Sequence, residues 1–188
     1  MADLLPLLER SGAVLRGHFI LSSGRHSDTY FEKFRVLEQP AVLSELCCSI
    51  AEHHAGQGFT HVAGPLTGGI LIAMETARQM GLPAIYVENE NGRKTLRRGA
   101  GIPEGAKVLV VDDVLTTGLS LVETIDAVKR FGGDPAAAAV LIDRSGPDFH
   151  MPIPIFAVCR VDAQSWAPGD LPDELKAIPA VKPGTRRD

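Results

Sequence analysis

Uninterrupted apolar runs and segments with helical apolar spacing alternate along most of this chain. The strongest run covers residues 108–111, four aliphatic residues in succession, and Val114 and Leu115 extend it beyond two acids. Such a run is typical of a strand that is buried on both faces, as in a parallel sheet covered by helices. Similar patterns predict further strands at residues 59–63, 84–88, 136–142 and 153–161.

Helical patterns lie between these predicted strands. Apolar residues recur at helical spacing within residues 41–55, 70–80 and 121–131. The alternation of strands and helices predicts right-handed βαβ units, and hence an α/β fold with a parallel sheet and helices on both faces. Pro152 and Pro154, near the start of the last predicted strand, indicate that this strand lies at an edge of the sheet.

The amino-terminal part of the chain has a different pattern. A short helix is predicted over residues 3–10, and two strand-like segments, residues 17–21 and 28–32, flank a polar loop. This loop, residues 22–27, offers hydroxyls, backbone N–H groups and a cation to a small planar anion, or else is a solvated hairpin connection. The proline-rich carboxyl-terminal tail contains one helical turn, predicted near residues 173–176.

Composition fits a single domain, residues 1–188, and excludes several classes of partner. The 188 residues are 45% hydrophobic and have a mean hydropathy of +0.07, which suits one α/β domain with an ample core. A formal charge of −4 and a pI of about 5.9 give no global basic field for nucleic acid or an anionic membrane. No apolar run approaches the roughly 20 residues of a membrane span, and the first residues lack a signal-peptide pattern.

The cysteines indicate neither a disulfide framework nor a metal site. Cys47, Cys48 and Cys159 are odd in number and two of them are adjacent, so a reducing cytoplasm is the expected setting. His53 and His54 share a predicted helix with the first two cysteines. These four residues lack a paired Cys-x-x-Cys or His-x-x-x-His arrangement, so we expect no metal to bind them.

The acids and hydroxyl residues after the strongest apolar run are candidates for binding a sugar phosphate. Asp112 and Asp113 come at the carboxyl end of that strand, and the turn that follows contains Thr116, Thr117, Gly118 and Ser120. Free N–H groups at the next helix start favour an anion, and the two carboxylates could hold vicinal hydroxyls. The alternative is an ordinary strand-turn-helix with a Ser or Thr cap, but two buried acids are costly there without a partner.

Three other segments carry candidate binding residues. The glycines of residues 64–69 would let backbone approach a diphosphate closely. Residues 89–105 are either a mobile lid that closes on a polyanion or a solvated basic hairpin, and contain Arg93, Lys94, Arg97 and Arg98. Arg144 follows the strand at residues 136–142 and is expected at the same carboxyl edge of the sheet as the acids.

Several of these segments resemble motifs of a known enzyme family. Residues 110–118 resemble the phosphoribosyl-diphosphate (PRPP) signature of type I phosphoribosyltransferases. Residues 19–30 resemble the substrate loop of orotate phosphoribosyltransferases, and residues 141–144 resemble the arginine-bearing strand end of the same enzymes. The resemblance covers nearly the whole chain. It implies a parallel-sheet core over about residues 40–161 and a small hood, mainly residues 1–36 with a contribution from the tail.

The resemblance also implies a reaction and a set of site residues. The reaction would join orotate to PRPP with Mg²⁺, held mainly by PRPP and water, and give orotidine 5'-phosphate and diphosphate. The implied PRPP-binding residues are Thr67, Gly68, Arg93, Lys94, Asp112, Asp113, Thr116, Thr117, Gly118 and Ser120. The implied catalytic residues are Asp112, Asp113, Lys94, Arg97 and Arg98. The implied orotate-binding residues are Ser23, Gly24, Tyr30, Phe31, Thr116 and Arg144. A homodimer with shared active sites is implied as well.

The chain departs from the pattern of this family at several places, and other functions stay open. Gly68 stands where well-known orotate enzymes place a lysine, and Lys94, Arg97 and Arg98 are alternatives for the lid lysine. A second hypothesis is transfer to another base, although Thr116 argues against 6-oxopurines because those enzymes place an aspartate there. A third is a non-catalytic PRPP-sensing regulator that binds nucleic acid, which the acidic charge disfavours.

Overall fold

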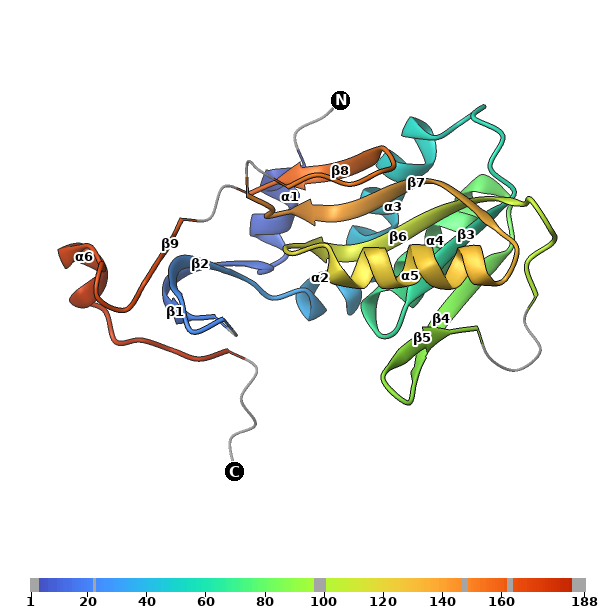
Figure 1. Ribbon diagram of the computed structural model, residues 1–188. Helices are drawn as coiled ribbons and strands as arrows, with labels where there is room; N and C mark the ends of the chain where they lie inside the picture. The colour runs from blue at the N-terminus through green and yellow to red at the C-terminus, as the bar shows by residue number, and fades with distance from the viewer. Residues whose placement is uncertain (1–3, 22, 97–100, 147–148, 162–163, 184–188) are drawn as a thin grey trace.

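A six-stranded sheet forms the centre of the molecule. The computed structural model describes residues 4–21, 23–96, 101–146, 149–161 and 164–183 (Figure 1). The strand order is β5-β4-β3-β6-β7-β8, parallel throughout except for the antiparallel β4–β5 pair. The strands are β3 His61–Pro65, β4 Ala84–Glu90, β5 Arg93–Thr95, β6 Lys107–Leu115, β7 Asp134–Asp143 and β8 Ile155–Arg160.

Helices cover both faces of this sheet, as the apolar patterns predict. They are α3 Pro40–His53, α4 Gly68–Met80 and α5 Leu119–Arg130. Leu109 and Val111 of β6 pack in one core with α3 and α4, whereas Val108 and Val110 pack on the other face with α5 (Figure 1). All four side chains are fully buried, which explains the uninterrupted aliphatic run.

The boundaries of several elements differ from the sequence predictions. β6 continues through Asp112 and Asp113 to Leu115, so the acids lie within the last part of the strand and not after it. The first strand of the sheet begins at His61 and the last one at Ile155, two residues later than predicted in each case. The last strand is an edge strand, as its flanking prolines indicate.

A small antiparallel sheet with the order β1-β2-β9 lies beside the large one. It is built from β1 Val14–Ile20, β2 His26–Phe31 and β9 Ser165–Trp166. The short helices α1 Leu5–Arg10 and α6 Asp173–Lys176 contact β1, and α2 Phe34–Leu37 packs against α3 and α4. The tail also pairs with β1. The Val181 N–H donates to the His18 carbonyl, and the Val181 carbonyl accepts from the Ile20 N–H, both at 2.8 Å. Figure 1 shows the tail running beside β1 and β2. The sequence did not predict β9.

None of the helices in the described ranges has the length and apolar character required to cross a bilayer.

Candidate active site

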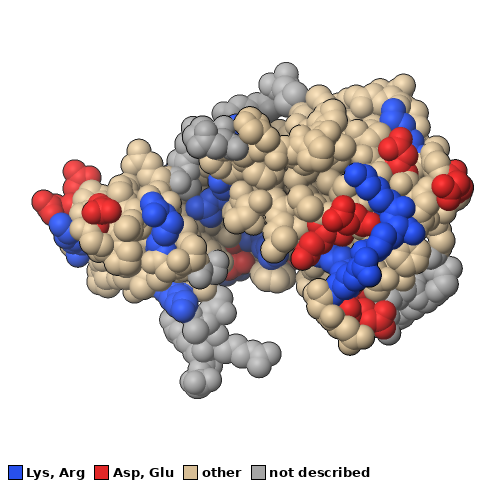
Figure 2. All heavy atoms as spheres, in the orientation of Figure 1, with Lys and Arg blue, Asp and Glu red and all other residues tan. Residues whose placement is uncertain are grey.

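The carboxyl ends of the parallel strands carry most of the expected site residues. A cavity of about 400 Å³ opens there, and Lys94, Asp112, Thr116, Thr117, Gly118 and Ser120 all line it. Leu66 and Glu123 complete its wall. Figure 2 shows a cleft between the lobe of the small sheet and the α/β core, with acidic and basic side chains inside it. The structure therefore brings the turn residues, one acid and one basic-segment cation into one pocket.

The turn before α5 is held by a glycine and not by a hydroxyl cap. Gly118 is the N-cap residue, adopts φ 76° in the left-handed region, and caps no N–H group by a side chain. A Cβ at this position would also lie 2.6 Å from the ring of Phe149. The alternative of a Ser or Thr residue at the N-cap position is therefore wrong. The Leu119 N–H points to Thr117 Oγ1 at a long 3.5 Å, and N–H groups of this first turn are positioned to bind an anion.

The two acids are buried and held by hydrogen bonds. The Asp113 N–H donates to Asp112 Oδ1 at 2.9 Å, and the Val114 N–H donates to Asp113 Oδ1 at 2.8 Å. Burial raises the pKa of Asp112, and the charge of Asp113 acts in the same direction. Lys33 Nζ lies 2.7 Å from Asp113 Oδ2. This ion pair supplies the partner that a buried acid requires.

Lys94 of the basic segment lines the same pocket as the turn before α5. Its ammonium donates to the Ser120 hydroxyl at 2.7 Å, to the Ser120 carbonyl at 2.9 Å and to the Thr124 hydroxyl at 3.2 Å. Burial lowers the pKa of Lys94, while the carboxylates of Asp112 and Glu123 oppose that shift. Of the three candidates for the lid lysine, Lys94 is therefore the one that the described part of the chain places at this pocket.

The first part of the basic segment is a hairpin. Asn91 and Gly92 both have positive φ, 52° and 78°, as a tight two-residue turn between antiparallel strands requires. Arg93 is exposed on β5. This part of the segment matches the hairpin alternative. Arg97 and Arg98 lie outside the described residues.

The glycine-rich segment after β3 is packed so closely by other protein atoms that its glycines leave no room for a side chain. A Cβ on Gly64 would lie 2.0 Å from the Gly69 carbonyl oxygen, and one on Gly68 would lie 2.1 Å from Asp113 Oδ2. Gly68 and Gly69 are buried in the first turn of α4, and Thr67 before them is exposed. The Leu66–Thr67 peptide bond is cis, which nothing in the sequence indicates. Packing against β3 and Asp113 thus accounts for glycines that we expected to serve a ligand.

The expected base-binding residues divide between two faces of β2. Tyr30 is half-buried, and burial raises its pKa while the nearby Arg144 guanidinium opposes the shift. Burial lowers the pKa of Arg144, against the opposing charges of Tyr30 and Asp28. Phe31 points the other way and packs in the core with α3 and α4, so the structure does not place it beside Tyr30. Gly24 forms a turn in which its N–H donates to Leu21 O at 2.9 Å, with Ser23 exposed beside it.

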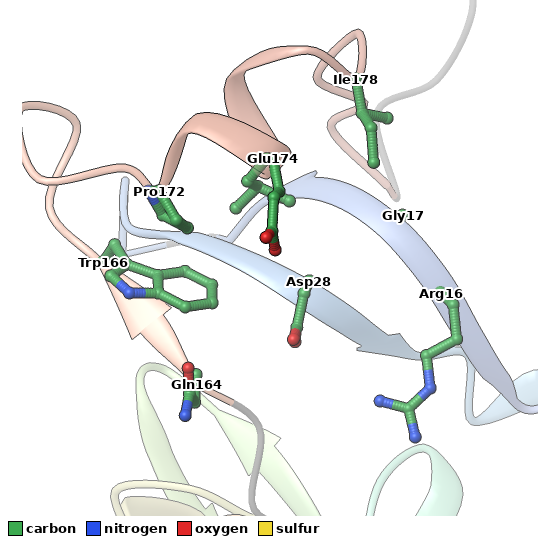
Figure 3. A pocket seen from close by; sticks show the side chains of 9 residues that line it. Arg16, Gly17, Asp28, Gln164, Trp166, Pro172, Glu174 and Ile178 are labelled. Carbon is green, nitrogen blue, oxygen red and sulfur yellow. The ribbon is translucent and has the colours of Figure 1, made fainter.

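Two charged residues near the site were missed by sequence reasoning. Lys33 belongs to no motif, and only its position just after the substrate-loop strand could have drawn attention to it. Asp28 faces a second cavity of about 460 Å³, which β1, β2, β9 and α6 enclose. Figure 3 shows the carboxylates of Asp28 and Glu174 around this cavity, with the ring of Trp166 at one side.

Comparison with known proteins assigns the family. A family profile described as "Phosphoribosyl transferase domain" matches residues 35–166. Among similar proteins, the orotate phosphoribosyltransferase of Pelotomaculum thermopropionicum is 43% identical over 98% of this chain and 97% of its own length. That of Maricaulis maris is 43% identical over 98% of this chain and 96% of its own length.

Solved structures agree with this assignment. The crystal structure of orotate phosphoribosyltransferase from Aeropyrum pernix superposes with a TM-score of 0.70 at 32% identity, over 84% of this chain and 93% of its own. An adenine phosphoribosyltransferase from Thermoanaerobacter pseudethanolicus superposes with a TM-score of 0.61 at 18% identity, over 71% of this chain and 88% of its own, and shares the fold. The chain belongs to the phosphoribosyltransferase family, and within it to the orotate phosphoribosyltransferases.

Proposed function

We propose that this chain transfers the 5-phosphoribosyl group of PRPP to orotate and releases diphosphate. The observation that carries the proposal is the pocket at the carboxyl edge of the sheet in which the buried carboxylate of Asp112 adjoins the hydroxyl-rich turn before α5. The names of relatives that match along their whole length support orotate as the acceptor. In the reaction the bond from ribose C1 to diphosphate breaks, its electron pair leaves with diphosphate, and C1 joins a ring nitrogen that loses its proton.

The turn before α5 would hold the 5'-phosphate. Its hydroxyl groups and the N–H groups of the first helical turn would form a site for a dianion at the positive end of the helix dipole. The proposed phosphate ligands are Thr116, Thr117, Gly118 and Ser120. Lys94, which already contacts Ser120, would add a cation to the same phosphate or to the diphosphate.

The two acids would bind the ribose hydroxyls and stabilise the transition state. Breaking the bond at C1 before the new bond is complete develops positive charge on the sugar, and fixed carboxylates nearby lower the energy of that charge. Asp112 and Asp113 are held by backbone N–H groups, so little reorganisation is needed during the reaction. No side chain has to act as a nucleophile, since positioning and electrostatics supply the rate increase.

The diphosphate would lie at the start of α4. Thr67 and Gly68 are the proposed ligands there, with Arg93 of the hairpin as a further cation. Movement of the basic segment over the bound diphosphate, with Arg97 and Arg98, is part of the proposal.

Magnesium fits the chemistry of this pocket as a partner of the substrate. Mg²⁺ prefers oxygen ligands and commonly binds through one or two carboxylates, substrate phosphates and water. Within the described residues no group of three or more His, Cys, Asp or Glu side chains could hold a metal ion unaided. Asp112 and Asp113 are the residues that would contact the ion or its waters. When bound, Mg²⁺ would neutralise charge on the leaving diphosphate.

Orotate would bind against the outer face of β2. Arg144 offers a cation to its carboxylate or carbonyl edge, and Tyr30 offers an aromatic surface on the same side. Ser23 and Gly24 of the substrate loop would supply further polar contacts. The small sheet would act as the hood of this site, with the core at about residues 40–161.

We also propose that the chain acts as a homodimer in the cytoplasm. The exposed face of α4 carries Leu71 and Met74, which are 45% and 60% exposed, and Leu66 and Phe34 are exposed as well. Apolar groups of this size on a helix face suit contact with a second copy. Arg97 and Arg98 would then serve the neighbouring active site, whereas Lys94 serves its own.

The experiment that tests this proposal is orotate-dependent release of diphosphate from PRPP in the presence of Mg²⁺. Turnover with formation of orotidine 5'-phosphate is expected. A folded protein that binds PRPP without turnover would contradict the catalytic proposal and favour a PRPP-sensing regulator.

A further inference from the structure

A lysine outside every recognised motif is paired with one of the two site acids. Lys33 lies between β2 and α2, and its ammonium is 2.7 Å from Asp113 Oδ2. The Lys33 side chain is 38% exposed, whereas that of Asp113 is 10% exposed. The Asp113 end of the ion pair is therefore buried, and the Lys33 end is partly open to solvent.

Gly68 leaves the space that this ion pair occupies. A Cβ at position 68 would lie 2.1 Å from Asp113 Oδ2 and 3.2 Å from Leu37 Cδ1, so no other residue fits without displacing the carboxylate. The other carboxylate oxygen, Oδ1, accepts the Val114 N–H. Asp113 is thus fixed by a backbone donor on one oxygen and by Lys33 and the start of α4 around the other.

The surroundings of this carboxylate are positively charged. Gly68 is the first residue of a thirteen-residue helix, whose N-terminal N–H groups carry partial positive charge. An ammonium group has three donors, and the contact with Asp113 uses one of them. A polyanionic sugar that places its hydroxyls on Asp113 would meet this cation beside it.

We propose that Lys33 is a positioning residue for PRPP: it holds the Asp113 carboxylate toward the ribose hydroxyls and presents a cation to the attached diphosphate. This inference rests on the proposed binding of PRPP in this pocket. It assigns Lys33 to the sugar donor and not to the base, although Lys33 follows the strand that carries Tyr30 by only two residues.

The test is calorimetric titration of PRPP with Mg²⁺ into the wild type and into K33A, K33M, K33R and R35A. Loss of a charged contact of this kind is expected to weaken PRPP binding by about 10- to 100-fold in K33A and K33M. K33R should recover much of the loss. R35A is the matched control, because Arg35 lies two residues further on, in α2, and pairs with the exposed Glu38 at 2.9 Å.

Steady-state kinetics separate positioning from a structural effect. For K33M we expect a raised KM for PRPP and an orotate KM close to that of the wild type. The Lys33 substitution should weaken PRPP binding less in the D113N background than in the wild type, because the positioning part of its effect requires the Asp113 carboxylate whereas the contact with the diphosphate does not. Thermal unfolding identifies which variants are folded. If K33A is not folded, the comparison of K33M with K33R provides the test.

Two results would overturn the inference. One is a folded K33M that binds PRPP as tightly as the wild type. The other is an equal loss in K33R and K33M. By contrast, Lys33-dependent PRPP binding without conversion of orotate would overturn the proposed reaction and leave this inference standing.

Discussion

Lys94 Nζ lies 2.7 Å from the Ser120 hydroxyl, and this contact joins the β4–β5 hairpin to the first turn of α5 in the same chain. Glu123, one helical turn further on, lies 3.9 Å from the same ammonium. A cation is therefore already present in the pocket that would receive the 5'-phosphate. The closing of a lid is not needed to bring it there.

Replacing Lys94 by methionine should reduce kcat/KM for PRPP by about 10- to 100-fold, because a charged donor to the phosphate is lost. The lowered pKa of Lys94 means that its charge is lost at a lower pH than in an ordinary lysine. The PRPP affinity of the wild type should therefore fall as the pH becomes alkaline. The affinity of K94M should not show this alkaline fall. K176M, in an exposed pair with Asp173, is the control. A K94M enzyme with unchanged affinity and pH profile would contradict this role.

Asn in place of Asp112 should lower activity and raise stability. The pKa of Asp112 is raised in the folded state, so the folded protein binds the proton more tightly than the unfolded chain does. Its charged form therefore destabilises the fold at neutral pH, and stability falls as pH rises through the raised pKa. We expect kcat to fall by about 10²- to 10³-fold and the free energy of unfolding to rise by about 0.5–2 kcal/mol.

The matched control for that substitution is D113N. Asp113 has a cationic partner, so removing its charge leaves the Lys33 ammonium unpaired and should lower stability. Urea unfolding at pH 7 measures both changes. The change in the free energy of unfolding is expected to be positive for D112N and negative for D113N. Equal destabilisation of both variants would show that burial of the Asp112 charge does not cost stability.

Alanine at position 68 should damage the site without unfolding the protein. The added Cβ would lie 2.1 Å from Asp113 Oδ2 and must push the carboxylate out of place. We expect a stability cost of about 1–3 kcal/mol and a fall in turnover of at least about tenfold. G169A is the control, since a Cβ there has no neighbour within 4 Å. Full activity in G68A would show that the position of Asp113 is not critical.

A hydrogen-bonded cluster between α3 and α4 should make stability depend on pH in the acid range. Hydrogen bonds from Arg78, with others from Gln79 and Ser44, hold the pKa of Glu75 at about 2. The stabilisation is present above the ordinary pKa and is lost as pH falls toward 2. E75Q should cost about 1–2 kcal/mol at pH 7 and less at pH 3 by urea unfolding. E45Q, at an exposed position on α3, should cost much less; equal losses would refute the cluster.

Local patterns were sufficient to predict the core of the fold. The aliphatic run of β6 and the helical spacing of α5 are properties of short segments. In the structure β6 is buried on both faces, and the apolar residues of α5 pack against the sheet, as these patterns predict. The prediction that Asp112, Thr116 and Ser120 share a pocket followed from their place at one strand end. The hairpin at Asn91 could have been predicted too, because Asn-Gly is a strong signal for a two-residue turn.

Features that depend on contacts between distant segments could not be predicted. β9 has two residues and forms only because Trp166 and Ser165 pair with β2. The pairing of Lys33 with Asp113 joins the small sheet to the large one, and no local pattern encodes it. The burial of Phe31 is also decided by tertiary packing, since alternation alone does not say which face of β2 meets the core.

The most direct test of the central claim is a panel of bases offered to the purified protein with PRPP and Mg²⁺. Diphosphate release is measured in parallel with orotate, uracil, adenine and hypoxanthine at equal concentrations. We expect rapid release with orotate alone, because the Arg144 guanidinium beside Tyr30 suits an acidic pyrimidine and Thr116 provides no acid for a 6-oxopurine. Faster release with a purine, or none with any base despite PRPP binding, would contradict the account.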